Sequence, residues 1–137
     1  MSRRTLALNF VVLLAVAALS RQAVAQSSQF PDGVYLVVVQ AGDGIQAAPG
    51  VYMMSFDGHG VFQLQRDTLV MVMGAYTSRG DTLEVEDEEG PERCTAPSIR
   101  GAYRWTLASD GLSLKPVRDP CRGWRSMLTV RPIARKH

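Results

Sequence analysis

The sequence predicts an all-β domain, an eight-stranded antiparallel up-and-down β-barrel, and three observations lead to this fold class. Beyond Ser28 the apolar residues occur in short or alternating runs interrupted by glycine, aspartate and proline, as in strands joined by turns. The stretches GAYTSRGDTLEVEDEEGPERC and GAYRWTLASDGLSLKPVRDPC share one template: a Gly-Ala-Tyr start, a Gly/Asp turn and a final cysteine. All tyrosines stand in Gly-Val-Tyr or Gly-Ala-Tyr, where glycine lets a strand bend at a barrel corner.

The first element along the chain is a predicted secretory signal peptide over residues 1–25. Arg3 and Arg4 precede an apolar run over 5–19, and Ala23-Val24-Ala25 is a small-x-small cleavage site. The apolar run is shorter than a membrane-spanning helix requires, and the alternative is an uncleaved N-terminal anchor. We expect residues 26–137 to form a single domain with one core.

The charge of the chain changes when the leader is removed. Cleavage takes away Arg3, Arg4 and Arg21 but no acidic residue, so the formal net charge falls from +2 to −1. A basic nucleic-acid binder is therefore not expected. Acidic residues dominate 26–92 and basic residues dominate 93–137, which predicts either a dipolar surface for partners or opposite charges that pair across neighbouring strands.

Eight strands follow from the alternating runs. We predict them at 33–40, 51–56, 60–65, 69–77, 82–86, 99–107, 112–118 and 124–131.

The connections between these strands fall into two groups. Those at 57–59, 78–81 and 109–111 are tight and contain the glycine that hairpin turns need. Those at 41–50, 87–98 and 119–123 are longer, and 66–68 is short. Because alternate connections of an up-and-down barrel lie at opposite ends, the tight turns should gather at one end and the long loops at the other.

The two cysteines, Cys94 and Cys121, are predicted to form a disulfide. An exported chain with two cysteines favours one bond, and both residues fall in connections at the loop-rich end. Zinc requires three or four Cys or His ligands, and the other candidates are His59 and His137. We therefore expect no metal and no cofactor.

The alternation of the strands points the tyrosines inward. It places Leu107 opposite Leu114, Tyr76 opposite Leu83 and Gly74 opposite Val85. The predicted inward residues are Tyr35, Val37, Val39, Tyr52, Met54, Phe56, Phe62, Leu64, Val70, Val72, Tyr76, Leu83, Trp105, Leu107, Leu114, Leu128 and Val130.

An interior of this kind would suit an apolar or amphipathic ligand, and the alternative is that the same side chains fill the core. We expect Tyr52, Tyr76 and Tyr103 near the loop-rich end. The predicted ligand-binding residues are Tyr52, Phe56, Phe62, Tyr76, Tyr103 and Trp105.

The strand at 69–77 is apolar on both faces. Its outward side would carry Leu69, Met71 and Met73, a patch suited to a protein partner, a dimer or a membrane surface. The alternative is that a loop or the N-terminal segment covers the outward side of this strand, which explains the apolar pattern equally well.

No catalytic residues are predicted. His59 is the one internal histidine and falls in a turn, and the chain has no nucleophile-elbow, phosphate-loop or paired-carboxylate signature. We expect a protein that is not an enzyme.

The two Gly-Ala-Tyr stretches, together with RGWRSMLTV, resemble the calycin group of barrels and specifically a lipocalin-like domain of secreted bacterial proteins. The resemblance extends from about Asp32 to Pro132 and implies an antiparallel barrel with an open, loop-rich end and a binding cavity. Lipocalins carry Gly-x-Trp on the first strand, where this chain has Gly33-Val34-Tyr35. Their late arginine has two candidates here, Arg125 and Arg131.

The expected function is that of an exported, periplasmic or extracellular, non-catalytic protein that binds a small apolar or amphipathic molecule in a β-barrel. The alternative is a protein-interaction or envelope-associated module with a filled core, working through its outer surface.

Overall fold

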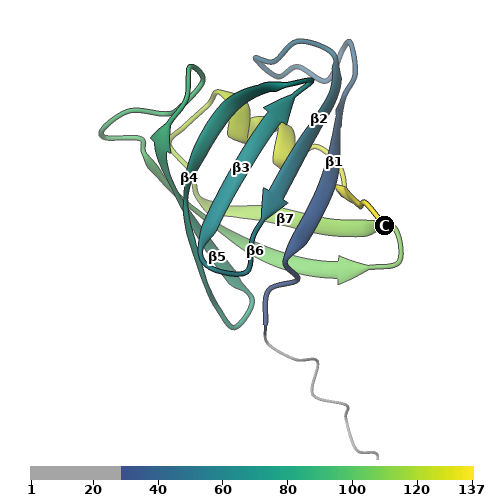
Figure 1. Cartoon of the computed structure of the whole chain (residues 1–137), viewed down its shortest axis with the longest axis vertical. Coiled ribbons are helices and arrows are strands. Elements are labelled where there is room, and N and C mark those ends of the chain that lie inside the picture. Colours follow the sequence, from purple (N-terminus) through teal and green to yellow (C-terminus); the bar gives the residue numbers. More distant parts are fainter. Residues whose placement is uncertain (1–28) are drawn as a thin grey trace, which may run out of the picture.

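The computed structural model describes residues 29–137, so the predicted signal peptide at 1–25 lies outside the described residues. The described chain forms one antiparallel sheet (Figure 1). Its elements are β1 (Gly33–Val39), β2 (Gly50–Phe56), β3 (Val61–Arg66), β4 (Leu69–Arg79), β5 (Thr82–Glu89), β6 (Arg100–Ala108), β7 (Gly111–Arg118), the 3-10 helix η1 (Trp124–Leu128) and β8 (Ala134–Arg135).

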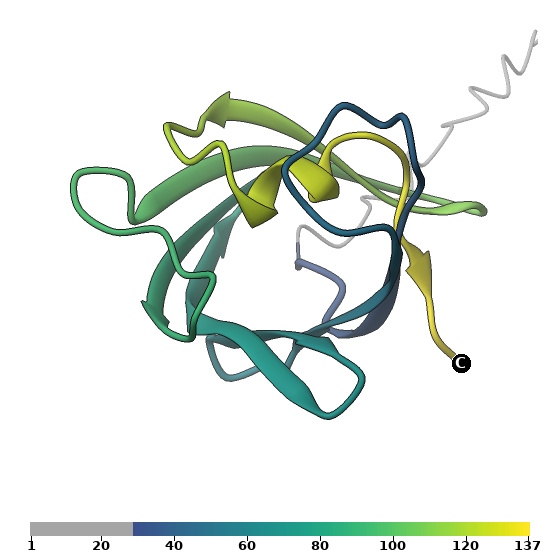
Figure 2. The same cartoon turned by 90° about the horizontal axis from the view of Figure 1, so that it is seen from above.

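The strands curl into a nearly closed barrel, as predicted. Their order in the sheet is β7-β6-β5-β4-β3-β2-β1-β8, so each of the first seven strands pairs with its neighbour in sequence. The chain then returns, and β8 pairs with β1 through Tyr35 and Leu36. One bridge, Leu112 to Ile133, joins β7 to the segment before β8. Figure 2 shows the resulting ring from above.

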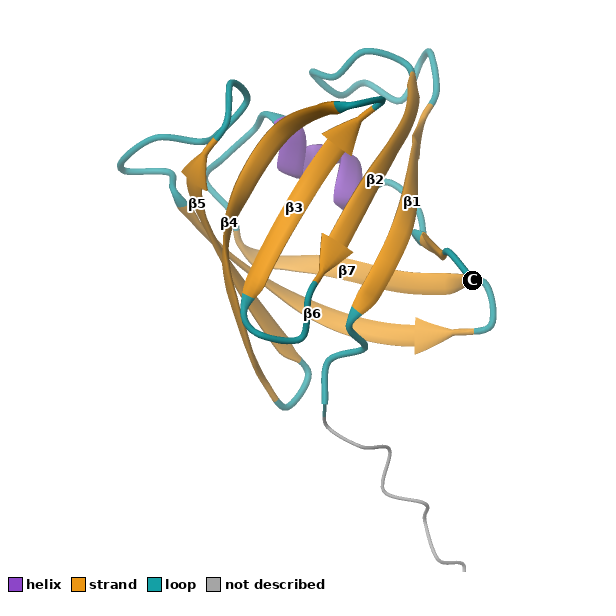
Figure 3. Cartoon of the chain, viewed as in Figure 1, coloured by secondary structure: helices purple, strands orange, loops and turns teal. Residues whose placement is uncertain are grey.

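The connections sort by length between the two ends, as expected. In Figure 3 the β2–β3 and β4–β5 turns lie at the end where the described chain begins. The β1–β2 and β5–β6 loops and η1 lie at the opposite end. We call these the tight-turn end and the loop-rich end.

The predicted eighth strand at 124–131 is wrong. Its first half is η1, and the two-residue β8 begins only at Ala134. Trp124, Met127 and Leu128 are buried at the i, i+3, i+4 spacing of a helical face, a period that an alternating interpretation overlooks. Val130, predicted to point inward, is 39% exposed.

The hairpin registers differ from the predicted ones by two residues. Leu107 pairs with Leu112, Tyr76 with Val85 and Gly74 with Asp87. A shift of two keeps every side chain on the predicted face. Leu107 is nevertheless 45% exposed, next to the last residue of β6 and close to the β6–β7 turn.

A β-bulge in β4 changes the predicted outer patch. Leu64 pairs with Val72 and Gln65 with Val70, which leaves Met71 as the extra residue. Such an extra residue reverses the alternation, so Met71 packs against the core although it was expected to point outward. Val70 was expected to point inward, but it pairs with Gln65, which alternates with the buried Leu64 and faces Met53 of β2. Val70 therefore belongs to the outer row of the sheet.

Opposite charges pair across β5 and β6, as one of the two interpretations of the charge asymmetry predicts. Arg100 Nε lies 2.9 Å from Glu86 Oε2, and Arg104 Nη1 lies 3.4 Å from Asp81 Oδ2. These side chains are largely exposed, so each pair contributes at most about 1 kcal/mol.

The cysteines are joined as predicted. The Cys94–Cys121 disulfide connects the β5–β6 loop to the segment between β7 and η1, with the two Cα atoms 6.0 Å apart. It therefore fastens two segments of the loop-rich end to each other.

Replacing both cysteines by alanine should lower the free energy of unfolding by about 3–4 kcal/mol. A bond between residues 27 positions apart restricts the unfolded chain by this amount on the chain-entropy model. Urea denaturation measures the loss, and wild-type protein unfolded in reductant should show a similar one. An unchanged midpoint in both would contradict the stabilising role.

Candidate functional site

The barrel interior is filled by its own side chains. Those without exposed surface include Tyr35, Met54, Phe62, Leu83 and Tyr103, drawn from β1, β2, β3, β5 and β6. Of the predicted ligand-binding residues, Tyr52, Phe56, Phe62, Tyr76 and Tyr103 lie in this core, and Trp105 is half-buried beside it. The sequence thus identified inward residues, but they pack on one another.

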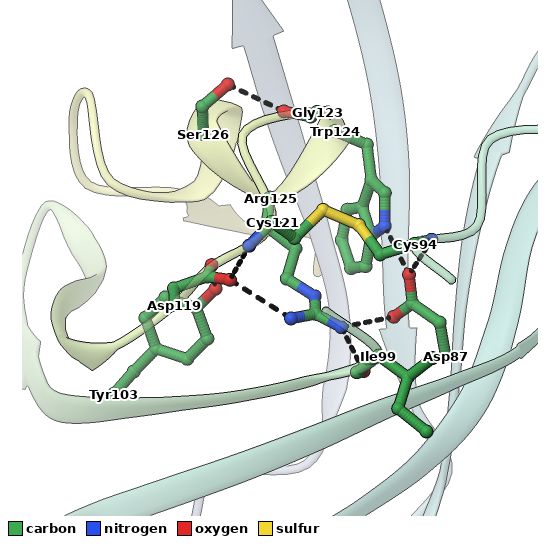
Figure 4. Close-up of a disulfide and its surroundings, with 10 residues drawn as sticks. All are labelled: Asp87, Cys94, Ile99, Tyr103, Asp119, Cys121, Gly123, Trp124, Arg125 and Ser126. Carbon is green, nitrogen blue, oxygen red and sulfur yellow. Dashed lines mark hydrogen bonds and ion pairs between the residues drawn. A yellow bond between two sulfur atoms is a disulfide. The ribbon is translucent and has the colours of Figure 1, made fainter. Parts of the chain in front are cut away.

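The loop-rich end is closed by η1 and a buried ion cluster (Figure 4). Phe62 stacks on Trp124 of η1 with the ring centroids 5.7 Å apart. The next residue, Arg125, is fully buried and forms ion pairs with Asp87 at 3.1 Å and Asp119 at 3.0 Å. Its guanidinium also donates to the carbonyl oxygen of Ile99.

Each carboxylate of this cluster is held by a backbone N–H of the disulfide. Cys94 N donates to Asp87 Oδ2 at 2.7 Å, and Cys121 N donates to Asp119 Oδ1 at 3.0 Å. The indole of Trp124 donates to Asp87 as well, and Tyr103 Oη donates to Asp119. Such neighbours offset the cost of burying three charges.

The ion cluster was not predicted, although one signal was available. Asp87 continues the inward row of Leu83 and Val85 on β5 and is buried like them. The sequence interpretation instead ended the strand at residue 86 and placed Asp87 in the connection at 87–98. A lone carboxylate in an inward row requires a buried cation, but the alternation does not indicate which of several arginines supplies it.

Tyr76 lies at the tight-turn end, which corrects the expectation that it is near the loop-rich end. It stands close to the β4–β5 turn, because β4 continues to Arg79. Its hydroxyl donates to Asp32 Oδ1 at 2.6 Å and accepts from Gly58 N at 2.9 Å. Burial, with the Asp32 carboxylate beside it, raises the pKa of Tyr76 to about 12.

The segment before β1 closes part of this end. Phe30 is buried with its ring centroid 4.8 Å from Phe56, 5.9 Å from Tyr76 and 5.6 Å from Trp105. Arg135 of β8 donates to the carbonyl oxygen of Asp32 at 2.6 Å. Aromatic contacts and short hydrogen bonds thus anchor the start of the described chain in the barrel.

A hollow of about 980 Å³ lies beside Phe30 at the tight-turn end. We call it the Trp105 hollow. Its apolar wall includes Phe30, Trp105 and Leu107, and its polar wall includes Asp32, Asp81 and Arg135. This combination suits a molecule with an apolar body and a polar group.

Other hollows are smaller. One of about 380 Å³ lies between the β1–β2 loop and η1 and is lined by Ile45, Asp119 and Arg125, whose Nε has no hydrogen-bond partner among residues 29–137. Another, of about 290 Å³, lies over the outer faces of β4, β5 and β6. Sites for drug-sized ligands usually have about 300–1,000 Å³, so the first hollow lies near the bottom of this range and the second just below it.

The described residues show neither a metal cluster nor a spanning helix. No three His, Cys, Asp or Glu side chains within 29–137 are placed to hold a metal ion together. Over the same residues, no helix has the length and apolar character needed to cross a membrane. His59 is exposed in the β2–β3 turn, where its backbone N–H donates to Asp57 Oδ1.

Replacing Arg125 by methionine should destabilise the fold by about 3–5 kcal/mol. Methionine fills similar space but leaves Asp87 and Asp119 buried without their counter-charge. Arg131→Met is the matched control, because its ion pair with Asp43 is partly exposed and should contribute at most about 1 kcal/mol. Urea denaturation compares the two, and equal losses would contradict the role of the ion cluster.

Raising the pH should weaken the fold through Tyr76. Its folded pKa of about 12 lies above the ordinary value of 10.0, so its contribution is complete below pH 10.0 and is lost as pH rises toward about 12. Tyr76→Phe removes this titration, while Tyr35, whose pKa burial also raises, still titrates. Urea denaturation measures the free energy of unfolding of wild type and of Tyr76→Phe at about pH 9 and about pH 11. The difference between the two proteins should be smaller at the higher pH, because only wild type loses the contribution of Tyr76. A constant difference would contradict the assignment.

Comparison with known proteins gives no family for this chain: no family model, no curated protein and no solved structure matches it.

Proposed function

We propose that this chain is an exported, non-catalytic protein that binds a small apolar or amphipathic molecule in the Trp105 hollow. The observation that carries the proposal is the position of this hollow in a barrel whose interior is otherwise filled. Its volume of about 980 Å³ is at the upper end of the range for small-molecule sites. The proposal agrees with the lipocalin-like interpretation in ligand class, but it moves the site to the opposite end of the barrel.

The walls of the hollow support this ligand class. Leu107 is 45% exposed although it is a large apolar side chain on a strand, and Trp105 next to it on β6 is only half-buried. A bound apolar group would remove this surface from water, at about 25 cal/mol for each Å² buried. Asp32, Asp81 and Arg135 leave polar partners for a head group at the rim.

Export is supported by the disulfide. Disulfides persist in oxidising compartments such as the periplasm and the extracellular space, and the Cys94–Cys121 bond belongs to the core arrangement of the loop-rich end. The predicted leader at 1–25 points to the same compartments.

A second candidate function is a protein-interaction or envelope-associated module. The filled interior favours it, because a barrel that holds no ligand inside can act only through its surface. Native mass spectrometry of the exported protein separates the two candidates. A small adduct released on denaturation supports the ligand-binding protein, and a bare mass favours the module.

Leu107→Glu should weaken the binding of an apolar probe to the Trp105 hollow. The probe is 1-anilinonaphthalene-8-sulfonate, and its affinity should fall about tenfold or more when a carboxylate replaces the apolar wall. Val117→Glu is the matched control, since Val117 is also on an exposed strand position, at 60%, but does not line the hollow. Loss of binding in both variants, or no binding by wild type, would contradict the proposal.

A further inference from the structure

The outer surface of the barrel is divided into a charged and an uncharged half. The outward residues of β5, β6 and β7 include Glu84, Glu86, Arg100, Arg104 and Lys115. On β1 to β4, every outward residue from Val34 to Thr77 is uncharged. Figure 1 shows these four strands side by side on the near side of the barrel. We call this surface the β1–β4 face.

The β1–β4 face is mostly apolar and partly exposed. Leu36 pairs with Met53 and Val38 with Val51 on neighbouring strands, and Val51 is 56% exposed. Soluble proteins usually intersperse charges on such a surface, and a contiguous apolar patch marks an interaction site. The charged ends of the strands do not interrupt the face: Arg66 lies over the ring of Tyr52 at the loop-rich end, 5.3 Å from its centroid.

The polar side chains of the face are self-complementary. Gln63 and Gln65 stand at its centre on β3, facing Ser55 and Met53 of β2. An amide carries both donors and acceptors, so it can pair with an identical amide, whereas a charged group would meet its own charge across a two-fold axis. A surface whose own strands present amides and no charged side chain at its centre is suited to meeting its own copy.

The borders of the face are also complementary in charge. On one side β5 places Glu84 and Glu86 opposite Thr77 and Ala75. On the other side Lys136, after β8, reaches Met53 with its Nζ 4.0 Å from the sulfur. A two-fold axis parallel to the strands would bring the acidic border of one copy toward the basic border of the other. The symmetry repeats this contact, so the dimer would contain two of them.

We propose that two copies of this chain associate through their β1–β4 faces, with β2 and β3 at the centre of the contact. Apolar pairs such as Leu36–Met53 supply the buried area, and the glutamines supply hydrogen bonds. The strands β1–β4 contribute no charged side chain to the middle of this contact, and the ammonium of Lys136 beside Met53 is the one cation that it must accommodate. This inference does not depend on the proposed ligand.

The test is sedimentation velocity on protein isolated after export, over a range of concentrations. Wild type should sediment as a dimer that dissociates on dilution. Gln63→Glu with Gln65→Glu places four carboxylates at the two-fold contact and should weaken dimerisation about a hundredfold or more. Gln40→Glu with Gln46→Glu makes the same chemical change at exposed positions beyond the face and should leave dimerisation unchanged.

Circular dichroism confirms that both double variants are folded. A wild type that is monomeric at every concentration would overturn the proposal. A dimer that persists in Gln63→Glu with Gln65→Glu would also overturn it, because a different surface would then hold the copies together. Loss of the dimer in the Gln40→Glu, Gln46→Glu control would overturn the specificity for the face.

Discussion

A guanidinium without exposed surface lies between two carboxylates at the loop-rich end, and the closure of that end depends on it. Arg125 belongs to η1, Asp119 to the segment just before it and Asp87 to β5, so two distant parts of the chain meet at one charge. The disulfide joins the same segments, and the backbone N–H of each cysteine donates to one of the carboxylates. Covalent and ionic contacts therefore hold the same geometry, and disturbing one weakens the other.

This closure is the reason that the proposed ligand site lies outside the barrel interior. With η1 held across the barrel, Trp124 packs on Phe62 and the aromatic side chains of the interior contact one another. At the tight-turn end Phe30 fills only part of the opening, and the Trp105 hollow remains beside it. Under the proposed function, the ligand of this chain would therefore lie at the tight-turn end and not inside the barrel.

The sequence predicted the first seven strands, most of the inward residues and the disulfide, because each depends on local alternation or on the end to which a connection belongs. Tyr35, Tyr52, Tyr76 and Tyr103 all point inward, since a register shift of two preserves the face. Alternation could not reveal the bulge at Met71, which adds one residue without a distinctive signature. It also could not reveal η1, whose helical spacing covers a single turn, or the buried partners of Arg125, which lie 38 and 6 residues away.

The pairing of β1 with β8 has a consequence for how the chain matures. β1 pairs with Ala134–Arg135 of β8, so Tyr35 and its partner Arg135 lie 100 residues apart in sequence. Arg125 likewise pairs with Asp87, which precedes it by 38 residues. The sheet from β1 to β7 can form as a series of local hairpins, whereas its two edges close only when residues 133–135 are in place. Non-local pairing of this kind is slow and leaves strand edges exposed to aggregation until the sheet closes.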